Sequence, residues 1–259
     1  MSTRIDHAFA RARTESRAAL ITYLMAGDSS AEASLSAARD CIRAGADLIE
    51  LGFPFSDPIA DGPTIQRAGE RALASGTTLS KVLEIAASLR RFEPSTPIVL
   101  MGYLNPVMAM GLERFFTCAA EAGVDGVILP DLPQDEAVSL RAEAQRTGLS
   151  LIAMLAPTST PARRASVLAH ASGFTYFVSV TGVTGARTEN ADVSPHLRAI
   201  RAESSVPVVV GFGIGTPEQA RAAAMHADGV VVGSAIVERI SRGEPLEPFV
   251  RSLRAALTR

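Results

Sequence analysis

The sequence has few cysteines, almost no charge imbalance and no long apolar run, and each shortage excludes a class of protein. Its two cysteines, Cys41 and Cys118, lie far apart without metal-ligand spacing, so we expect no disulfide framework, and a reducing cytoplasm fits best. The net charge of -2 gives no reason to expect nucleic acid or an anionic membrane as a partner. The apolar stretches are too short to cross a bilayer, and residues 1–16 lack the apolar core of a secretory signal.

Two common kinds of catalytic group are also scarce. The only lysine, Lys81, falls in a predicted helix away from any strand end, so we do not expect a Schiff base. The histidines fall in or beside predicted helices, and none pairs with another histidine or a cysteine at ligand spacing, so we expect no metal site. They are His7, His170, His196 and His226. Carboxylates remain as the candidate acid–base groups.

Length and periodicity predict a single α/β domain, a (β/α)8 TIM barrel that spans residues 1–259. Short apolar runs alternate with amphipathic, helix-like stretches, and several runs are apolar throughout, as strands covered on both faces should be. Eight alternations without a long linker favour this barrel over an open doubly wound sheet, whose GxGxxG motif is missing after the first run. The predicted strands are residues 19–25, 47–51, 98–102, 126–129, 149–154, 174–180, 206–211 and 229–233.

Three further helices are predicted beyond the eight strand–helix units. They lie at the N-terminus (4–13), after the second strand (79–92) and at the C-terminus (247–257). In such barrels the active site forms at the C-terminal ends of the strands and in the loops that follow. Polar residues at those places are therefore the candidates for function.

Acidic residues gather at the end of the second predicted strand. Glu50 lies inside an otherwise apolar run, where a carboxylate is costly to bury unless it is paired, hydrogen-bonded or protonated. It is either a buried glutamate satisfied by neighbouring groups or a general acid–base with a raised pKa. Asp57 and Asp61 follow in a loop shaped by prolines, and we interpret Asp57 as a turn residue. Composition alone does not decide whether Asp61 is a turn residue or a catalyst.

Glycine-containing turns end the last three predicted strands. They read GVTGA at 182–186, GFGIGT at 211–216 and GSA at 233–235. Glycine lets backbone N–H groups approach an anion, and a helix N-terminus adds a favourable dipole. Any one such turn could be a simple tight connection. Together they favour a phosphate site, which is common after strands seven and eight of a barrel.

The stretch that contains the carboxylates resembles a known signature. Residues 49–66 read IELGFPFSDPIADGPTIQ, which is similar over eighteen residues to the tryptophan synthase α chain family. Further matching pieces are LITYLMAGD at 20–28, LMGYLNP at 100–106 and VILPDLP at 127–133, so the resemblance covers essentially the whole chain. It implies a carbon–carbon lyase of L-tryptophan biosynthesis. The reaction is the retro-aldol cleavage of indole-3-glycerol phosphate to indole and glyceraldehyde 3-phosphate.

The resemblance assigns roles to individual residues. Glu50 aligns with the catalytic acid–base, and Asp61 aligns with the acid that contacts the indole ring nitrogen. Substrate binding is implied for Tyr23, Leu100, Ile128, Tyr176 and Thr184, the last in a polar, mobile lid that closes toward Asp61. Tyr23 departs from the apolar or small residue that the family usually has there. Phosphate binding is implied for Gly185, Phe212, Gly213, Gly233 and Ser234.

The resemblance also implies a partner and excludes a cofactor in this chain. The partner is a β subunit that uses pyridoxal phosphate and consumes indole, in an α2β2 heterotetramer. The apolar stretch Phe53, Pro54 and Phe55 either contacts that subunit or packs inward beneath the loop. Three alternatives remain open at this point: a free-standing indole-3-glycerol phosphate lyase, a catalytically idle regulatory subunit, and a sugar-phosphate isomerase on the same barrel.

Overall fold

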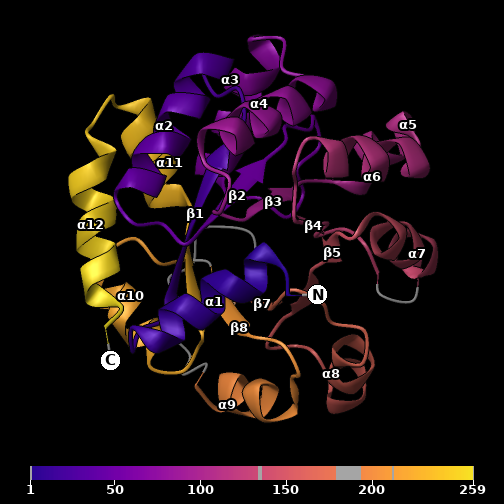
Figure 1. Cartoon of the computed structure of the whole chain (residues 1–259), viewed down its shortest axis with the longest axis vertical. Coiled ribbons are helices and arrows are strands. Elements are labelled where there is room, and N and C mark those ends of the chain that lie inside the picture. Colours follow the sequence, from indigo (N-terminus) through magenta and orange to yellow (C-terminus); the bar gives the residue numbers. More distant parts are fainter. Residues whose placement is uncertain (1, 134–135, 179–193, 212, 259) are drawn as a thin grey trace.

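The computed structural model describes residues 2–133, 136–178, 194–211 and 213–258, whose strands form one parallel, nearly closed barrel (Figure 1). Every strand ladder in it is parallel, and the strand order is β5-β4-β3-β2-β1-β9-β8-β7-β6. The strands are β1 (Ala19–Met25), β2 (Leu48–Gly52), β3 (Ile98–Met101), β4 (Gly126–Ile128), β5 (Ser150–Leu151), β6 (Ala153–Leu155), β7 (Thr175–Val178), β8 (Val208–Gly211) and β9 (Gly229–Val232).

The barrel closes through its fifth predicted strand. Residues 149–154 were expected as one strand, but Ile152 divides it into β5, which pairs with β4, and β6, which pairs with β7. β5 and β6 together fill one position of the barrel, the first pairing with the preceding strand and the second with the following one. The nine observed strands therefore occupy the eight positions of a (β/α)8 barrel. The predicted fold class is confirmed.

Helices surround the barrel on all sides (Figure 1). They are α1 (Arg4–Thr14), α2 (Ala31–Arg43), α3 (Pro63–Ala74), α4 (Leu79–Phe92), α5 (Leu104–Met110), α6 (Leu112–Glu121), α7 (Val138–Thr147), α8 (Pro161–Leu168), α9 (Ser194–Glu203), α10 (Pro217–Ala224), α11 (Ser234–Ser241) and α12 (Leu246–Ala256). Further helices do occur at the N-terminus, after β2 and at the C-terminus, as predicted.

Contacts show which helix of each pair is the additional one. After β2, α4 lies in the outer ring against α2 and α6, whereas α3 packs against β1 and α11. After β9, α12 lies in the ring against α2 and α10, whereas α11 packs against β1 and α3. Residues 79–92 and 247–257 do form helices, as predicted. Both helices belong to the outer ring, however, so the prediction that they are the additional helices is wrong. Within these two pairs the extra helices are α3 and α11, and each follows the C-terminal end of a strand.

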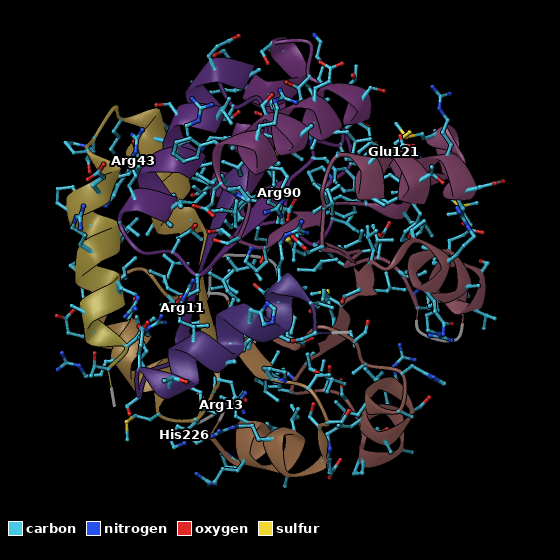
Figure 2. All side chains as sticks on the ribbon, in the orientation of Figure 1. Arg11, Arg13, Arg43, Arg90, Glu121 and His226 are labelled. Carbon is cyan, nitrogen blue, oxygen red and sulfur yellow. The ribbon has the colours of Figure 1, made fainter. Side chains whose placement is uncertain are left out.

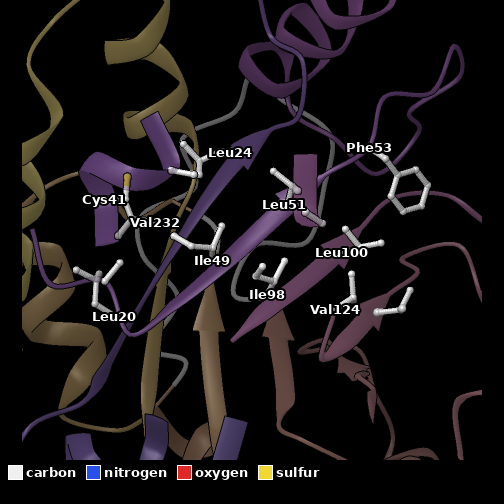
Figure 3. Close-up of a cluster of buried hydrophobic side chains, with 14 of the residues drawn as sticks. Leu20, Leu24, Cys41, Ile49, Leu51, Phe53, Ile98, Leu100, Val124 and Val232 are labelled. Atoms are coloured by element: carbon white, nitrogen blue, oxygen red, sulfur yellow. The ribbon is translucent and has the colours of Figure 1, made fainter. Parts of the chain in front are cut away.

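Alternation along the strands builds two separate cores. Side chains such as Ile21, Val99 and Val209 point into the barrel, and their strand neighbours point outward against the helices. Figure 3 shows the outer layer, in which Leu51 and Leu100 project from adjacent strands toward the helices. Position along the strand therefore decides which residues can reach a site inside the barrel.

Aspartates that precede β2, β4 and β9 tie the N-terminal ends of the strands together. Asp47, Asp125 and Asp228 each accept a backbone N–H at the start of the neighbouring strand. Each also pairs with an arginine, respectively Arg17, Arg90 and Arg201. The Arg17–Asp47 pair is the deepest, because both side chains are 2% exposed. This end of the barrel is built for stability.

Helix α1 crosses that same end of the barrel (Figure 1). Phe9 enters the inner core and meets the ring of Phe174 at 5.9 Å between centroids. Arg4 and Arg11 of α1 also reach Asp125 and Asp47, so the helix is held by charge as well as by apolar packing (Figure 2 labels Arg11). The opposite end, where the strands terminate, is left for function.

Candidate active site

A cavity of about 410 Å³ opens at the C-terminal ends of the strands. Its walls come from the inward faces of β1, β2, β3, β7 and β9 and from the segments after β2, β8 and β9. Acidic, phenolic, alcohol and amide residues are among those that line it, and none of the described lining residues is a lysine or an arginine. We call it the strand-end cavity.

Glu50 lines this cavity from β2. It is 1% exposed, and its Oε2 has no hydrogen-bond partner among the described residues. Burial raises its pKa from 4.5 to about 8, and the nearby negative charge of Asp61 adds to the rise. The side chain is therefore protonated at neutral pH, so it can give a proton to a bound molecule and later take one back.

Asp61 stands in the same cavity, in the last turn before α3. Burial raises its pKa from 3.8 to about 6, while a hydrogen bond with the Tyr103 hydroxyl lowers it. The same hydroxyl accepts the N–H of Ala60 at 2.9 Å, and the side-chain amide of Gln66 donates to the Asp61 carbonyl at 2.9 Å. Asp61 is thus ionised at neutral pH while Glu50 is protonated, a separation that suits acid–base chemistry.

The extra helix α3 fixes the position of Asp61. Its N-cap is Gly62, and Pro63 at its first turn presets the helical backbone. Near its C-terminal end, Arg71 forms two hydrogen bonds of 2.7 Å with Asp28, which follows β1. The loop that carries Asp61 is therefore anchored at both ends, to Tyr103 after β3 and, through α3, to the loop after β1.

The rings of Tyr23 and Tyr176 each pack directly against a glycine of a neighbouring strand. A Cβ on Gly52 would stand 2.2 Å from the Tyr23 hydroxyl, and one on Gly211 would stand 2.1 Å from the Tyr176 hydroxyl. Only glycine leaves room for these rings. Burial, together with the charges of Glu50 and Asp61, raises the pKa of both phenols, so both hydroxyls stay neutral. They can therefore act as hydrogen-bonding groups but not as bases.

The far end of the cavity is suited to an anion. Gly233 is the N-cap of α11 and has no side-chain cap, so the first N–H groups of the helix face the cavity at Ser234 and Ala235. Gly213 adopts φ +75°, a conformation that favours glycine, in the turn after β8. Gln219 shapes that turn, since its side-chain oxygen accepts the N–H of Gly215 at 2.8 Å. Backbone groups, rather than a cation, define this end.

Most of the residues singled out from the sequence do meet in this cavity. Those that line it are Tyr23, Glu50, Asp61, Tyr176, Gly213, Gly233 and Ser234. Thr184, Gly185 and Phe212 lie outside the described residues. Ile128 faces the barrel interior without lining the cavity. Asp57 is exposed on the loop, in keeping with its interpretation as a turn residue.

Leu100 is placed differently from the expectation. It is fully buried in the outer layer between strands and helices, and Figure 3 shows it beside Leu51 there. Its neighbour Met101 points inward and lines the cavity instead. The alternation of side chains along β3 therefore excludes Leu100 from the pocket and identifies Met101 as the pocket residue of that strand.

Sequence reasoning missed further residues of the site, among them Tyr103 and Ile65. Tyr103 was not singled out, although it holds Asp61 and Ala60 and meets Phe55 at 5.4 Å between ring centroids. Ile65, in the first turn of α3, lines the cavity as an apolar wall. A helix after the Asp61 loop would have pointed to Ile65, but no helix was predicted there. The Tyr103 contact joins segments more than forty residues apart and has no local signal.

The apolar stretch after β2 packs inward. Phe53 is 2% exposed and belongs to the outer core, Pro54 is buried, and Phe55 is half-buried against Tyr103. The alternative in which these rings lie beneath the loop therefore holds for Phe53. The exposed apolar side chain of this loop is Ile59, which is 72% exposed.

The described residues contain neither a cluster of metal ligands nor a helix that could span a membrane. Among the described residues, no three His, Cys, Asp or Glu side chains are grouped to hold a metal ion. No helix within the described ranges is long and apolar enough to span a membrane. Lys81 lies on α4, where its Nζ donates to the Gly76 carbonyl at 2.8 Å, well outside the strand-end cavity.

A parallel barrel with two strand-end carboxylates of separated pKa and a backbone-lined anion end is the architecture of a TIM-barrel enzyme that acts on a phosphorylated substrate. Comparisons with known proteins make the family specific. The model of the tryptophan synthase alpha chain family matches residues 9–256. The chain therefore belongs to the tryptophan synthase alpha chain family, whose members are lyases that cleave indole-3-glycerol phosphate.

Individual relatives agree with this membership. The tryptophan synthase alpha chain of Caulobacter vibrioides is 51% identical over 95% of this chain and 90% of its own. That of Geobacter sulfurreducens is also 51% identical, over 98% of this chain and 99% of its own. Among solved structures, Mycobacterium tuberculosis tryptophan synthase superposes with a TM-score of 0.93 at 38% identity and 100% coverage of both chains. The alpha chain of Legionella pneumophila gives 0.87 at 37% identity, over 99% of this chain and 98% of its own.

Proposed function

We propose that the strand-end cavity cleaves indole-3-glycerol phosphate with Glu50 as the acid–base and Asp61 as its electrostatic partner. Glu50 gives its proton to the indole ring carbon that bears the side chain and takes the proton of the adjacent side-chain hydroxyl. The carbon–carbon bond between them breaks, and indole and glyceraldehyde 3-phosphate leave. Asp61 stabilises the positive charge that develops at the ring nitrogen. The carboxylate of Glu50 ends the cycle protonated, as it began.

One observation carries the assignment of Glu50. It is a buried carboxyl group with an unpartnered oxygen in the cavity and a pKa raised to about 8. A protein gains no stability from such a group, because its ionised form is poorly solvated and unpaired. Its placement is explained by a reaction that needs a carboxylic acid at neutral pH.

The phosphate is proposed to bind at Gly213, Gly233 and Ser234, opposite the carboxylates. The N-terminus of α11 supplies N–H groups and a favourable dipole, which suffice for a phosphate without a cation. Tyr176, Met101 and Tyr23 then surround the ring and the chain of the ligand. Roles for Thr184, Gly185 and Phe212 stay predictions from the family resemblance.

We further propose that the chain acts in the cytoplasm beside a β subunit, in an α2β2 heterotetramer. No cofactor is needed in this chain under the acid–base mechanism, and pyridoxal phosphate is expected in the β partner alone. Two exposed apolar side chains support such docking: Ile59 on the loop after β2 is 72% exposed, and Met108 on α5 is 53% exposed. Tyr103 joins the two elements, since it is the N-cap of α5 and its hydroxyl accepts the N–H of Ala60, which is next to Ile59.

Indole release by the purified chain, alone and with a β subunit, tests this function. We expect slow cleavage alone and a large activation by the partner. Glu50→Gln should lower kcat by at least about 10²-fold, in line with a lost general acid–base, while phosphate ligands still bind. The exposed Glu113→Gln on α6 is the matched control and should behave as the wild type.

Each of the other outcomes contradicts a particular part of this proposal. High activity that a β subunit does not change would point to a free-standing lyase. No cleavage by the reconstituted complex, with folded chain and bound phosphate, would point to a regulatory subunit. Normal turnover in Glu50→Gln would remove Glu50 from the mechanism.

A further inference from the structure

Tyr23 brings to the strand-end cavity a hydrogen-bonding group that the proposed chemistry leaves unused. Its side chain is 6% exposed and lines the cavity from β1, directly opposite Glu50 in the register of β1 and β2. Its hydroxyl has no hydrogen-bond partner among the described residues, whereas the hydroxyl of Tyr103 is bonded to the Ala60 N–H. Because the ring lines the cavity, this hydroxyl is open to a partner that enters there.

The path of the ring decides which part of a ligand its hydroxyl meets. At the backbone end of the side chain, the Cβ of Tyr23 lies 3.4 Å from where a Cβ added to Gly233 would stand, at the anion end. At its tip, the hydroxyl lies 2.2 Å from the place of a Cβ on Gly52, two residues beyond Glu50 on β2. The phenol thus runs from the anion end to the carboxylates. A ligand with its phosphate at the first and its ring at the second lays its connecting carbon chain along Tyr23.

We propose that Tyr23 is a specificity-determining residue whose hydroxyl binds a hydroxyl group on the three-carbon chain of the substrate. The inference rests on the proposed function, because that function places phosphate and indole at the two ends of the cavity. A neutral phenol both donates and accepts, as an alcohol does, so the two groups are complementary. The neighbouring inward side chains Met101 and Val231 are apolar and offer no such bond.

Two indolyl phosphate ligands that differ only in the hydroxyl groups of the three-carbon chain distinguish a hydrogen bond from Tyr23 from simple packing of its ring. Indole-3-glycerol phosphate carries two chain hydroxyls, and 3-(indol-3-yl)propyl phosphate carries none. In the Glu50→Gln protein, which should hold the substrate without cleaving it, the added Tyr23→Phe change should weaken binding of the glycerol phosphate by about 5–10-fold, the value of one neutral hydrogen bond. Binding of the propyl phosphate should change by less than about twofold on the same reasoning. Both affinities are measured by titration calorimetry.

A matched change without a hydroxyl provides the control. Met101→Leu in the same Glu50→Gln protein alters the shape of the cavity alone and should affect both ligands alike. Equal effects of Tyr23→Phe on the two phosphates, or none on either, would overturn the inference while the proposed function stands. Failure of the Glu50→Gln protein to bind either phosphate would overturn both. Thermal denaturation of each variant establishes that the chain is folded.

Discussion

The buried carboxyl group of Glu50 should make the protein less stable as the pH rises, and Glu50→Gln should remove that loss. In the unfolded chain the group ionises near its ordinary pKa of 4.5, but in the folded protein it stays protonated up to about 8. Between these values the folded state binds more protons than the unfolded state. The free energy of unfolding therefore falls as the pH rises through this window.

The size of the effect follows from the two pKa values. Each pH unit between 4.5 and about 8 is worth about 1.4 kcal/mol, so ionising Glu50 costs the folded protein on the order of 5 kcal/mol above pH 8. Relaxation of the cavity and entry of water would lower this figure. Glutamine has nearly the shape of a protonated glutamate and does not ionise, so Glu50→Gln should keep its stability.

Urea denaturation of the two proteins at pH 5, 7 and 9 measures the difference. We expect similar stabilities at pH 5 and a clear advantage of Glu50→Gln at pH 9, together with its loss of turnover. The exposed Glu113→Gln on α6 should follow the wild type at every pH. If the wild type and Glu50→Gln lose stability in parallel from pH 5 to pH 9, Glu50 is not held in its protonated form by burial.

Three further changes test other parts of the structure. Tyr103→Phe removes the hydrogen bond that lowers the pKa of Asp61. The acidic limb of the pH–rate profile should therefore move above about 6, and kcat should fall roughly 10-fold, whereas an acidic limb that does not move would contradict this role of Tyr103. Asp47→Asn removes the buried partner of Arg17 and leaves only the half-exposed Glu15, so it should cost about 3–5 kcal/mol in urea denaturation. A loss below about 1 kcal/mol would mean that the charge of Asp47 does not hold Arg17 in place. Gly69→Ala should raise stability by about 0.5–1 kcal/mol, because the new methyl group on α3 meets only the Met25 side chain at 3.6 Å; a fall in Tm would refute it.

The barrel was predictable because its signals are local. Apolar runs, glycine after helices and capping residues such as Thr3 and Thr216 mark the units one by one. The division of the fifth strand at Ile152 was not predictable, since it depends on which neighbours the chain pairs with. The ring position of α4 and the extra position of α3 likewise depend on tertiary contacts.

The candidate site was predictable only in part for the same reason. Glu50 stands out because a charged residue interrupts an apolar strand, and in the structure it lines the cavity. The choice between Leu100 and Met101 depends on which face of β3 points inward, and continuous apolar residues leave that face unmarked. Tyr103 reaches Asp61 from another strand end, so its role needs three-dimensional geometry.

A structure of the chain with 3-(indol-3-yl)propyl phosphate tests the central claim most directly. The account predicts the phosphate at the turn of Gly213 and at the N-terminus of α11, with the indole nitrogen against the Asp61 carboxylate. The ring carbon that bears the chain should lie within hydrogen-bonding distance of Glu50. A ligand bound elsewhere, or one whose ring lies away from both carboxylates, would contradict the account.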